Sequence, residues 1–371
     1  MSTRLITVLS NLLFLFLLFL AAGCRKDPVV PPIESPKDPR TYTWTIDTLF
    51  VPDEFETALD DIWGANAHDV YAVGHNSGFR ETIFHYDGSK WNLMQPLPSP
   101  NYPPGRSFEI NRVFGFGSND VWIGGGEIFY NSTPAPNYLD STILFRYDGV
   151  LWQKQNLPLR EGSVRQIWGD RPDNLWIAGS RAIWHFDGLT WTRDSIPDFV
   201  PKSKLAQISR LSEDMNRNLI AIVGSFDPLV PGMDTFLLLR NSLGWSLLDK
   251  SSAGTTYNDN DARFGSVGLW RSPDGKMYSF GMAIFEQTAT SWTRIFQSAY
   301  PIRSMCGVID KSIFAAGLYG TVLHYDGNTW YPYDRLFNYN LVTSGAWTDG
   351  NEIFISAYFA SANKSVVMHG K

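Results

Sequence analysis

Short apolar runs separated by turn residues recur along most of the chain. In the clearest unit, runs at 62–64, 69–74 and 83–86 are followed by an Asp-Gly pair at 87–88 and by Trp91. Runs of this length, rich in β-branched and aromatic residues and bounded by Gly, Asp and Asn, are typical of β-strands. Each unit therefore predicts four short strands, with a tight hairpin turn at the Asp-Gly pair because Gly tolerates positive φ.

The unit repeats down the chain. Its order of residue types returns at 113–152 and at 167–191. More degraded copies cover 211–245, 270–292, 306–330 and 347–369. The spacing is roughly 36 to 59 residues, and four strands at about this period are typical of a propeller blade. A four-stranded sheet that is apolar on both faces cannot bury them alone, so the units are expected to stack around an axis.

The fold class that follows is all-β: a single seven-bladed β-propeller of four-stranded antiparallel blades. The last unit lacks its fourth strand, and residues 41–50 supply a candidate, with Trp44 in the place that Trp91 takes in the first unit. We expect this N-terminal strand to pair in the last blade and close the ring, which removes exposed sheet edges. The fourth and fifth units match the repeat motif poorly. A six-bladed ring in which these two units merge is therefore the alternative.

Residues 1–23 have the succession of segments that is typical of a secretion signal, so we exclude them from the prediction of the fold. Arg4 precedes an almost pure Leu/Phe run at 12–20, too short to span a bilayer alone, and small residues then lead to Cys24. This ending resembles the lipobox of bacterial lipoproteins, which implies cleavage before Cys24 and attachment of lipid, palmitate included, to that residue. An uncut membrane anchor or an ordinary secretory peptide is the alternative.

The stretch that follows is typical of a tether. Prolines are frequent between residues 28 and 39 and favour a semi-rigid, extended chain over 24–40, so we assign the propeller to 41–371. Lys26-Asp27, directly after the lipid site, is similar to the surface-export signal of Bacteroidetes lipoproteins. That similarity implies the outer membrane of a bacterium, with the propeller facing the cell surface.

The repeats carry a further resemblance. Their order of Trp-Gly, Asp-Val-Trp-Ala-Val-Gly, Tyr-Asp-Gly and Trp is similar to that of bacterial seven-bladed propellers, loosely akin to Kelch repeats and to photosystem assembly factors. The resemblance covers 41–371 and implies an architecture rather than an activity, because propellers host many unrelated functions. Asp87 and Gly88 are adjacent, whereas the sialidase Asp-box separates these residue types by one position, so we do not infer a sialidase.

Charge and cysteine content narrow the class of partner. A net charge of −6 without a basic stripe argues against nucleic acid and against anionic lipid head groups. Apart from Cys24 the chain holds only Cys306, so a lipid on Cys24 leaves no intrachain disulfide. We expect a monomer whose partner is a glycan or an envelope protein.

Insertions cluster on one side of the predicted ring. Connections between second and third strands share a face with the links between blades, and we call it the long-loop face; the remaining hairpins lie on the short-turn face. The longest connections on the long-loop face are 95–108, 125–140, 192–206, 225–234 and 248–263. One-sided insertions commonly mark the binding face of a repeat protein. Tyr130, Tyr138, Tyr257 and Tyr339 lie in connections on this face and are candidates for contact with a glycan or a protein.

Arginines recur near the start of the predicted inner strands. The four are Arg112, Arg165, Arg210 and Arg303. Asp60 and Asp61 stand at the matching place in the first unit. Arginines that point into the channel mouth can hold an acidic group of a ligand; a salt-bridged channel lining is the alternative.

No catalytic or metal-binding motif stands out in the sequence. It has no phosphate loop, nucleophile elbow or zinc-protease helix motif. Four histidines share one repeat position and are expected to be structural: His85, His185, His324 and His369. Asp259 and Asp261 are the best candidates for calcium but lack the Gly and Glu of an EF-hand loop, so we expect no cofactor and no metal.

Three functions remain open. The leading hypothesis is a non-catalytic, membrane-anchored propeller that binds a glycan or a protein through its long-loop face. One alternative is a glycan-acting hydrolase or lyase with carboxylates at the channel mouth. The other is a structural subunit of an envelope complex.

Overall fold

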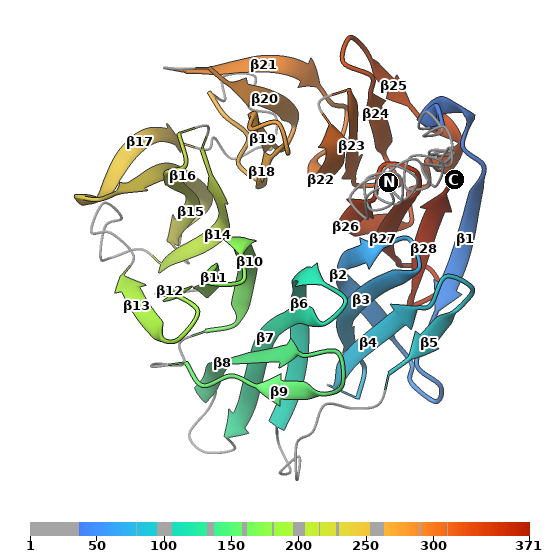
Figure 1. Ribbon diagram of the computed structural model, residues 1–371, viewed down its shortest axis with the longest axis horizontal. Helices are drawn as coiled ribbons and strands as arrows, with labels where there is room; N and C mark the ends of the chain where they lie inside the picture. The colour runs from blue at the N-terminus through green and yellow to red at the C-terminus, as the bar shows by residue number, and fades with distance from the viewer. Residues whose placement is uncertain are drawn as a thin grey trace, which may run out of the picture. The chain divides into compact units, whose positions relative to one another are not determined.

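Seven four-stranded antiparallel sheets account for the strands of the described residues. The computed structural model describes residues 37–78, 80–94, 106–131, 137–157, 162–179, 182–195, 205–214, 216–227, 230–252, 263–288, 291–309 and 311–371. The sheets stand around a common axis as blades (Figure 1). The predicted signal and Cys24 lie outside the described residues. No helix in the described part of the chain has the length and apolar character needed to cross a membrane.

The first four blades follow one another in the chain. Blade 1 comprises β2 (Thr57–Asn66), β3 (Asp69–Asn76), β4 (Glu81–Tyr86) and β5 (Trp91–Leu93). Blade 2 comprises β6 (Arg106–Gly117), β7 (Asp120–Asn131), β8 (Asn137–Tyr147) and β9 (Trp152–Lys154). Blade 3 comprises β10 (Val164–Arg171), β11 (Asn174–Gly179), β12 (Ala182–Phe186) and β13 (Trp191–Ser195). Blade 4 comprises β14 (Leu205–Glu213), β15 (Leu219–Asp227), β16 (Val230–Asn241) and β17 (Gly244–Ser252).

The remaining blades bring the two ends of the described chain together. Blade 5 comprises β18 (Gly268–Arg271), β19 (Met277–Phe280), β20 (Ala283–Gln287) and β21 (Trp292–Gln297). Blade 6 comprises β22 (Ile302–Ile309), β23 (Ser312–Gly317), β24 (Val322–Tyr325) and β25 (Trp330–Pro332). Blade 7 comprises β26 (Leu341–Thr348), β27 (Ile353–Phe359), β28 (Lys364–Gly370) and β1 (Trp44–Leu49). Two short 3₁₀ helices complete the described elements, η1 (Pro39–Thr41) and η2 (Asp334–Leu336).

The inner strands form an unbroken circle. β2 contacts β6, and the contacts continue through β10, β14, β18, β22 and β26 back to β2. The predicted all-β, seven-bladed fold is therefore confirmed. The fourth and fifth units form separate sheets, so the six-bladed alternative is wrong. The fourth and fifth units match the repeat motif poorly, but apolar residues of their sheets are still buried against neighbouring blades.

The N-terminal strand closes the ring, as the unfilled last repeat predicts. β1 pairs antiparallel with β28 from Trp44 opposite Gly370 to Leu49 opposite Ser365. Just before β1, Thr43 and Lys371 exchange two backbone hydrogen bonds of 2.8 and 3.0 Å. Residues 37–41 also pack on the propeller, where the Tyr333 hydroxyl donates to the carbonyl of Pro39 at 2.8 Å. Residues 37–371 thus form one compact unit.

Seven apolar cores lie between neighbouring blades, one at each interface. The repeated Trp-Gly pair has its physical reason there. A methyl group added at Gly115 would stand 2.5 Å from the ring of Trp63 in the preceding blade. One at Gly64 would stand 2.9 Å from Trp347. The glycine is required because the tryptophan of one blade lies flat against the backbone of the next.

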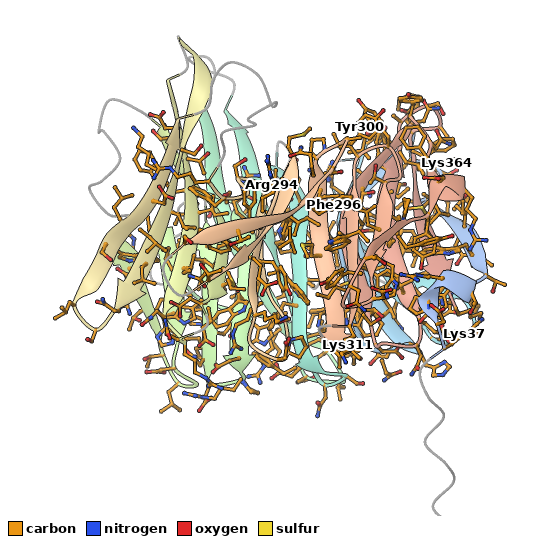
Figure 2. The ribbon with its side chains drawn as sticks, turned by 90° about the horizontal axis from the view of Figure 1, so that it is seen from above. Lys37, Arg294, Phe296, Tyr300, Lys311 and Lys364 are labelled. Atoms are coloured by element: carbon orange, nitrogen blue, oxygen red, sulfur yellow. The ribbon has the colours of Figure 1, made fainter. Side chains whose placement is uncertain are left out.

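The two faces of the ring differ as the sequence predicts, with one correction. The Asp-Gly turns lie on the short-turn face, and their glycines have φ values from 89° to 94° at Gly88, Gly149, Gly188 and Gly327. The insertions at 125–140 and 225–234 are not loops but extended hairpins, because β7–β8 and β15–β16 continue through most of them. Figure 2 shows Lys37 and Lys311 at the short-turn face and Tyr300 and Lys364 at the opposite one.

Candidate functional site

A β-bulge interrupts six of the described inner strands at corresponding positions. The extra residues are Asp60, Asn111, Arg165, Ser209, Arg303 and Ser344. A bulge leaves one residue unpaired and redirects the neighbouring side chains. The inner strands surround the axis, so these bulges decide which side chains line the channel near the long-loop face.

The bulges divide the predicted arginines between two adjacent positions. Arg165 and Arg303 are themselves the extra residues of β10 and β22. Arg112 and Arg210 each follow the extra residue by one position, as does Asp61 in β2. The sequence placed the four arginines only near the start of the inner strands, and the backbone register now assigns them to two adjacent positions.

The side chain of Arg112 joins three blades. Its Nε donates to the carbonyl of Arg165 at 2.6 Å. Its Nη1 donates to the carbonyl of Asn111 at 2.6 Å and to that of Asp60 at 3.4 Å. These carbonyls belong to blades 3, 2 and 1 respectively, so the guanidinium of Arg112 is held in place at the channel wall.

Asp61 is the carboxylate among these arginines. One oxygen accepts from the backbone N–H of Val113 in the next blade at 3.1 Å, and the other accepts from Ile62 N–H at 3.0 Å. Burial raises the pKa of Asp61, and the positive charges of Arg112 and Arg210 oppose that rise. Ser304 has the equivalent place in blade 6, where its hydroxyl accepts from Ala346 N–H at 3.0 Å.

Arg210 shows that the four guanidinium groups act on one another. Burial and repulsion from Arg112, Arg303 and Arg165 together lower its pKa to about 9, against the attraction of Asp61. These residues come from blades 1, 2, 3, 4 and 6, so only the channel brings them together. We call Arg112, Arg165, Arg210, Arg303 and Asp61 the arginine cluster; it holds four guanidinium groups and one carboxylate. At pH 7 Arg210 remains protonated, so an anion that enters the cluster relieves repulsion.

The first blade gives the channel mouth an acidic side. His75 Nδ1 lies 2.8 Å from a carboxylate oxygen of Asp60. The hydrogen bond to Asp60 raises the pKa of His75, partly opposed by burial, and Glu109 and Glu56 add to the rise. The mouth is therefore polarised, with the clustered arginines on blades 2, 3, 4 and 6 and carboxylates around His75.

Tyr339 belongs to a separate group of rings on the long-loop face. It lies 5.3 Å from Tyr319 and 4.9 Å from Phe337, centroid to centroid. Tyr300 is 4.8 Å from Tyr319 and hydrogen-bonds to Tyr339, which raises the pKa of Tyr300. Tyr339 is 68% exposed, so this aromatic platform presents ring area to solvent. Amphipathic rings of this kind suit contact with a sugar or a peptide.

Other predicted site residues are not placed in either group. Tyr130 and Tyr138 are paired in the backbone register of β7 and β8, but their side chains lie outside the described residues. Tyr257, Asp259 and Asp261 lie outside them altogether. Within the described ranges, no three His, Cys, Asp or Glu side chains gather closely enough to hold a metal ion.

The recurring histidines make hydrogen bonds within their own blades. His85 lies 2.7 Å from Asp69, and His369 lies 2.6 Å from Glu352. His185 lies 2.7 Å from Asn174. In blade 2 the same place is taken by Arg146, whose Nε donates to Asp120 at 2.8 Å. The third strand is thereby joined to the first residue of the second strand in blades 1, 2 and 3, and to the residue just before the second strand in blade 7.

Sequence reasoning missed Tyr300 and Tyr319. Tyr300 lies in the link between β21 and β22, and Tyr319 lies in the turn between β23 and β24. Both connections are short, so insertion length gave no signal. Tyr319 has a φ of 61°, a backbone conformation that only the folded turn reveals.

Comparison with known proteins supports the fold. No protein-family model matches the chain, and no curated protein matches it. Among solved structures, YCF48 bound to D1 peptide is similar with a TM-score of 0.57 and 15% identity, over 90% of this chain and 97% of that one. YCF48 from Cyanidioschyzon merolae gives 0.54 and 14%, over 87% and 98%. The Cps50 (Swd1) β-propeller domain of Myceliophteria thermophila gives 0.52 and 7%, over 87% and 99%. At these identities the likeness extends to the propeller fold alone.

Proposed function

We propose that this propeller is a non-catalytic binding protein that takes acidic groups of a protein ligand into the channel mouth from the long-loop face. The arginine cluster carries the proposal, because the charges of Arg112, Arg165 and Arg303 act on Arg210 while a single carboxylate, Asp61, attracts it. Arginine pairs with carboxylates through short, charge-assisted hydrogen bonds. A peptide bound to YCF48, a propeller of the same fold, supports a ligand of this class.

The proposal includes the location of the binding protein. The resemblance of residues 21–24 to a lipobox supports a lipid on Cys24, and Lys26-Asp27 supports export to the bacterial cell surface. The ligand is then an envelope or extracellular protein. Mass spectrometry of the mature amino end tests this part, since an unmodified Cys24 would contradict it.

Peptide binding to residues 37–371 tests the ligand. Short peptides rich in Asp and Glu are compared with amide twins rich in Asn and Gln by fluorescence anisotropy. We expect the acidic peptides alone to bind, with an affinity that falls as salt rises. Equal binding of both sets would refute the proposal.

Single substitutions locate the site. Arg303→Gln is preferred because its side chain is exposed, whereas Arg112 supports the blades through its carbonyl contacts. We expect Arg303→Gln to weaken acidic-peptide binding about tenfold, the usual scale for a hydrogen bond to a charged group. Arg294→Gln is the matched control, since Arg294 is an exposed arginine on β21 that contacts Gln297 at 3.3 Å. An equal loss in both variants would place the ligand elsewhere.

A glycan is the second candidate ligand, and the aromatic platform favours it. The exposed ring of Tyr339, supported by Tyr319 and Phe337, offers the flat apolar area on which sugars stack. A glycan-array screen of residues 37–371 tests it. A hit that is lost in Tyr339→Ala and kept in Phe55→Ala, another exposed ring, would establish a glycan site there.

A further inference from the structure

Five hairpins on the short-turn face share one construction. In each, the Oδ1 atom of an Asp or Asn accepts from the backbone N–H two residues later, at the tip of the turn, over 2.8 to 2.9 Å. The tip residues are Ser89, Val150, Leu189, Leu243 and Asn328 in blades 1, 2, 3, 4 and 6. The tips of these blades are therefore equivalent turn positions, although the glycine with positive φ precedes the tip in blades 1, 2, 3 and 6 and follows it, as Gly244, in blade 4.

Three consecutive blades carry an aliphatic side chain at this tip. Val150, Leu189 and Leu243 are 83%, 90% and 95% exposed. Single exposed apolar residues are common on protein surfaces. Here, however, the exposure recurs at one turn position in blades 2, 3 and 4, while blades 1 and 6 have Ser89 and Asn328 there. Leu151, next to Val150, is 51% exposed and extends the apolar area. We call these residues the aliphatic tips.

The chain enters the propeller on the face that carries the aliphatic tips. Lys37 Nζ donates to the carbonyl of Lys371 at 3.0 Å, where β28 ends on the short-turn face. Arg40 pairs with Asp326 in the tip hairpin of blade 6. Figure 2 shows Lys37 on the side opposite to Tyr300. The entry point therefore lies at blades 6 and 7, and the aliphatic tips lie at blades 2 to 4 on the same face.

We infer that the short-turn face rests on a lipid bilayer, with Val150, Leu189 and Leu243 inserted among the head groups. The occupant follows from the chain ahead of Lys37, which contains an apolar run at 12–20 and Cys24. If Cys24 carries the proposed lipid, the roughly 12 residues before Lys37 span at most about 40 Å in extended form, which keeps this face near the membrane. Moving aliphatic side chains from water into the membrane interface lowers the free energy, because apolar surface leaves water. This contact would present the arginine cluster and the aromatic platform away from the membrane.

Charge beside the tips selects the kind of lipid. Backbone N–H groups lower the pKa of Asp148 and Asp187, so each carboxylate is ionised next to its tip. Exposed Arg171 and Arg217 lie at the other short turns of blades 3 and 4, so charges of both signs stand beside the tips. A zwitterionic bilayer is therefore the expected surface, and the inference goes beyond the peptide-binding function because it concerns the opposite face.

The experiment uses residues 37–371 held at the amino end by a hexahistidine tag on phosphatidylcholine vesicles with a small share of nickel-chelating lipid. This attachment replaces the proposed anchor and does not depend on Cys24. An environment-sensitive NBD dye is placed on Leu189→Cys or Leu243→Cys, with Cys306, which is buried, replaced by Ser in every variant. Phe55→Cys is the control: Phe55 is 78% exposed, and its N–H donates to Ser77 near the long-loop face.

On attachment to vesicles we expect NBD emission at positions 189 and 243 to rise about twofold or more, the response of a probe that leaves water, and emission at 55 to stay constant. Replacing the remaining tips, Val150→Ser and Leu243→Ser, should reduce the gain at 189, whereas Ser89→Leu should increase it. Equal responses at 189, 243 and 55 would overturn the inference. So would a gain that appears without vesicles as protein concentration rises, because the tips would then contact a second copy. Acidic-peptide binding on the same samples reports the arginine cluster separately, so failure of one proposal is distinguishable from failure of the other.

Discussion

His324 predicts how the stability of the ring depends on pH. Its side chain is buried in blade 6, 4.9 Å from the ring of Phe314, and Nε2 lies 3.3 Å from the Ser312 hydroxyl. Burial, together with the charge of Arg40, lowers the pKa of His324 from 6.5 to about 4. The unfolded chain binds the proton near pH 6.5 and the folded chain only near pH 4. His324 therefore does not lower the free energy of unfolding above pH 6.5. Below pH 6.5 its protonation lowers the free energy of unfolding progressively, until the pH reaches about 4.

The magnitude follows from the two pKa values. At roughly 1.4 kcal/mol for each pH unit between 6.5 and about 4, protonation of His324 removes about 3 kcal/mol in all and about 2.5 kcal/mol by pH 4.5. Burial lowers the pKa of His185 and of His369 as well, so they add to the loss in the same direction. His324→Gln removes the titrating group while keeping a polar side chain opposite Ser312.

Urea unfolding of residues 37–371, followed by tryptophan fluorescence at pH 7.5 and 4.5, measures the effect. We expect His324→Gln to be the less stable protein at pH 7.5, and its stability relative to the wild type to improve by about 2.5 kcal/mol at pH 4.5. Leu323→Ala is the control, since Leu323 is 4% exposed on the same strand and does not titrate; its loss should be equal at both pH values. A His324→Gln deficit that is equally independent of pH would refute the reasoning.

Two further predictions concern packing and the buried thiol. Gly115→Ala should lower the free energy of unfolding by about 2 kcal/mol, because the added methyl group meets the ring of Trp63. Gly117→Ala is the control: its methyl group would have its nearest neighbouring atom 3.8 Å away, so its free energy of unfolding should stay within about 0.5 kcal/mol of the wild type. Thermal melts compare the two variants. Cys306 should react with a thiol reagent such as DTNB only after unfolding, because burial raises the pKa of its thiol; a stoichiometric reaction in the native protein would contradict the closed core between blades 6 and 7.

The fold could be predicted because the same short sequence motifs recur in most blades. Trp63, Gly64 and the Asp-Gly pair at 87–88 are local signals, and their recurrence gives both the strand number and the spacing. Trp44 before the first unit, together with a missing fourth strand in the last, was enough to predict the ring closure. Blades 4 and 5 were ambiguous because their turns have lost the Asp-Gly pair, although their strands keep the apolar residues.

The site could be predicted only in outline. Residue type and repeat position identified the arginines, and the structure brings Arg112, Arg165 and Arg303 together around Arg210. The bulges that separate Arg165 from Arg112 in register depend on backbone hydrogen bonds, which no residue in the repeat specifies. The ring contacts of Tyr339 likewise join connections of two blades, a proximity that arises only when the sheets stack.

Ring closure also has a consequence for truncated chains. β1 precedes the other described strands, whereas its partner β28 follows them, and 328 positions separate Thr43 from Lys371. Blades 1 to 6 each contain all of their own strands, whereas β1 has an unsatisfied edge until blade 7 is present. A product that terminates before Lys364 contains six complete blades and still exposes that strand to proteases. Closure therefore makes burial of the first described strand conditional on a complete seventh blade, so that a truncated chain differs from the whole one at an exposed strand edge.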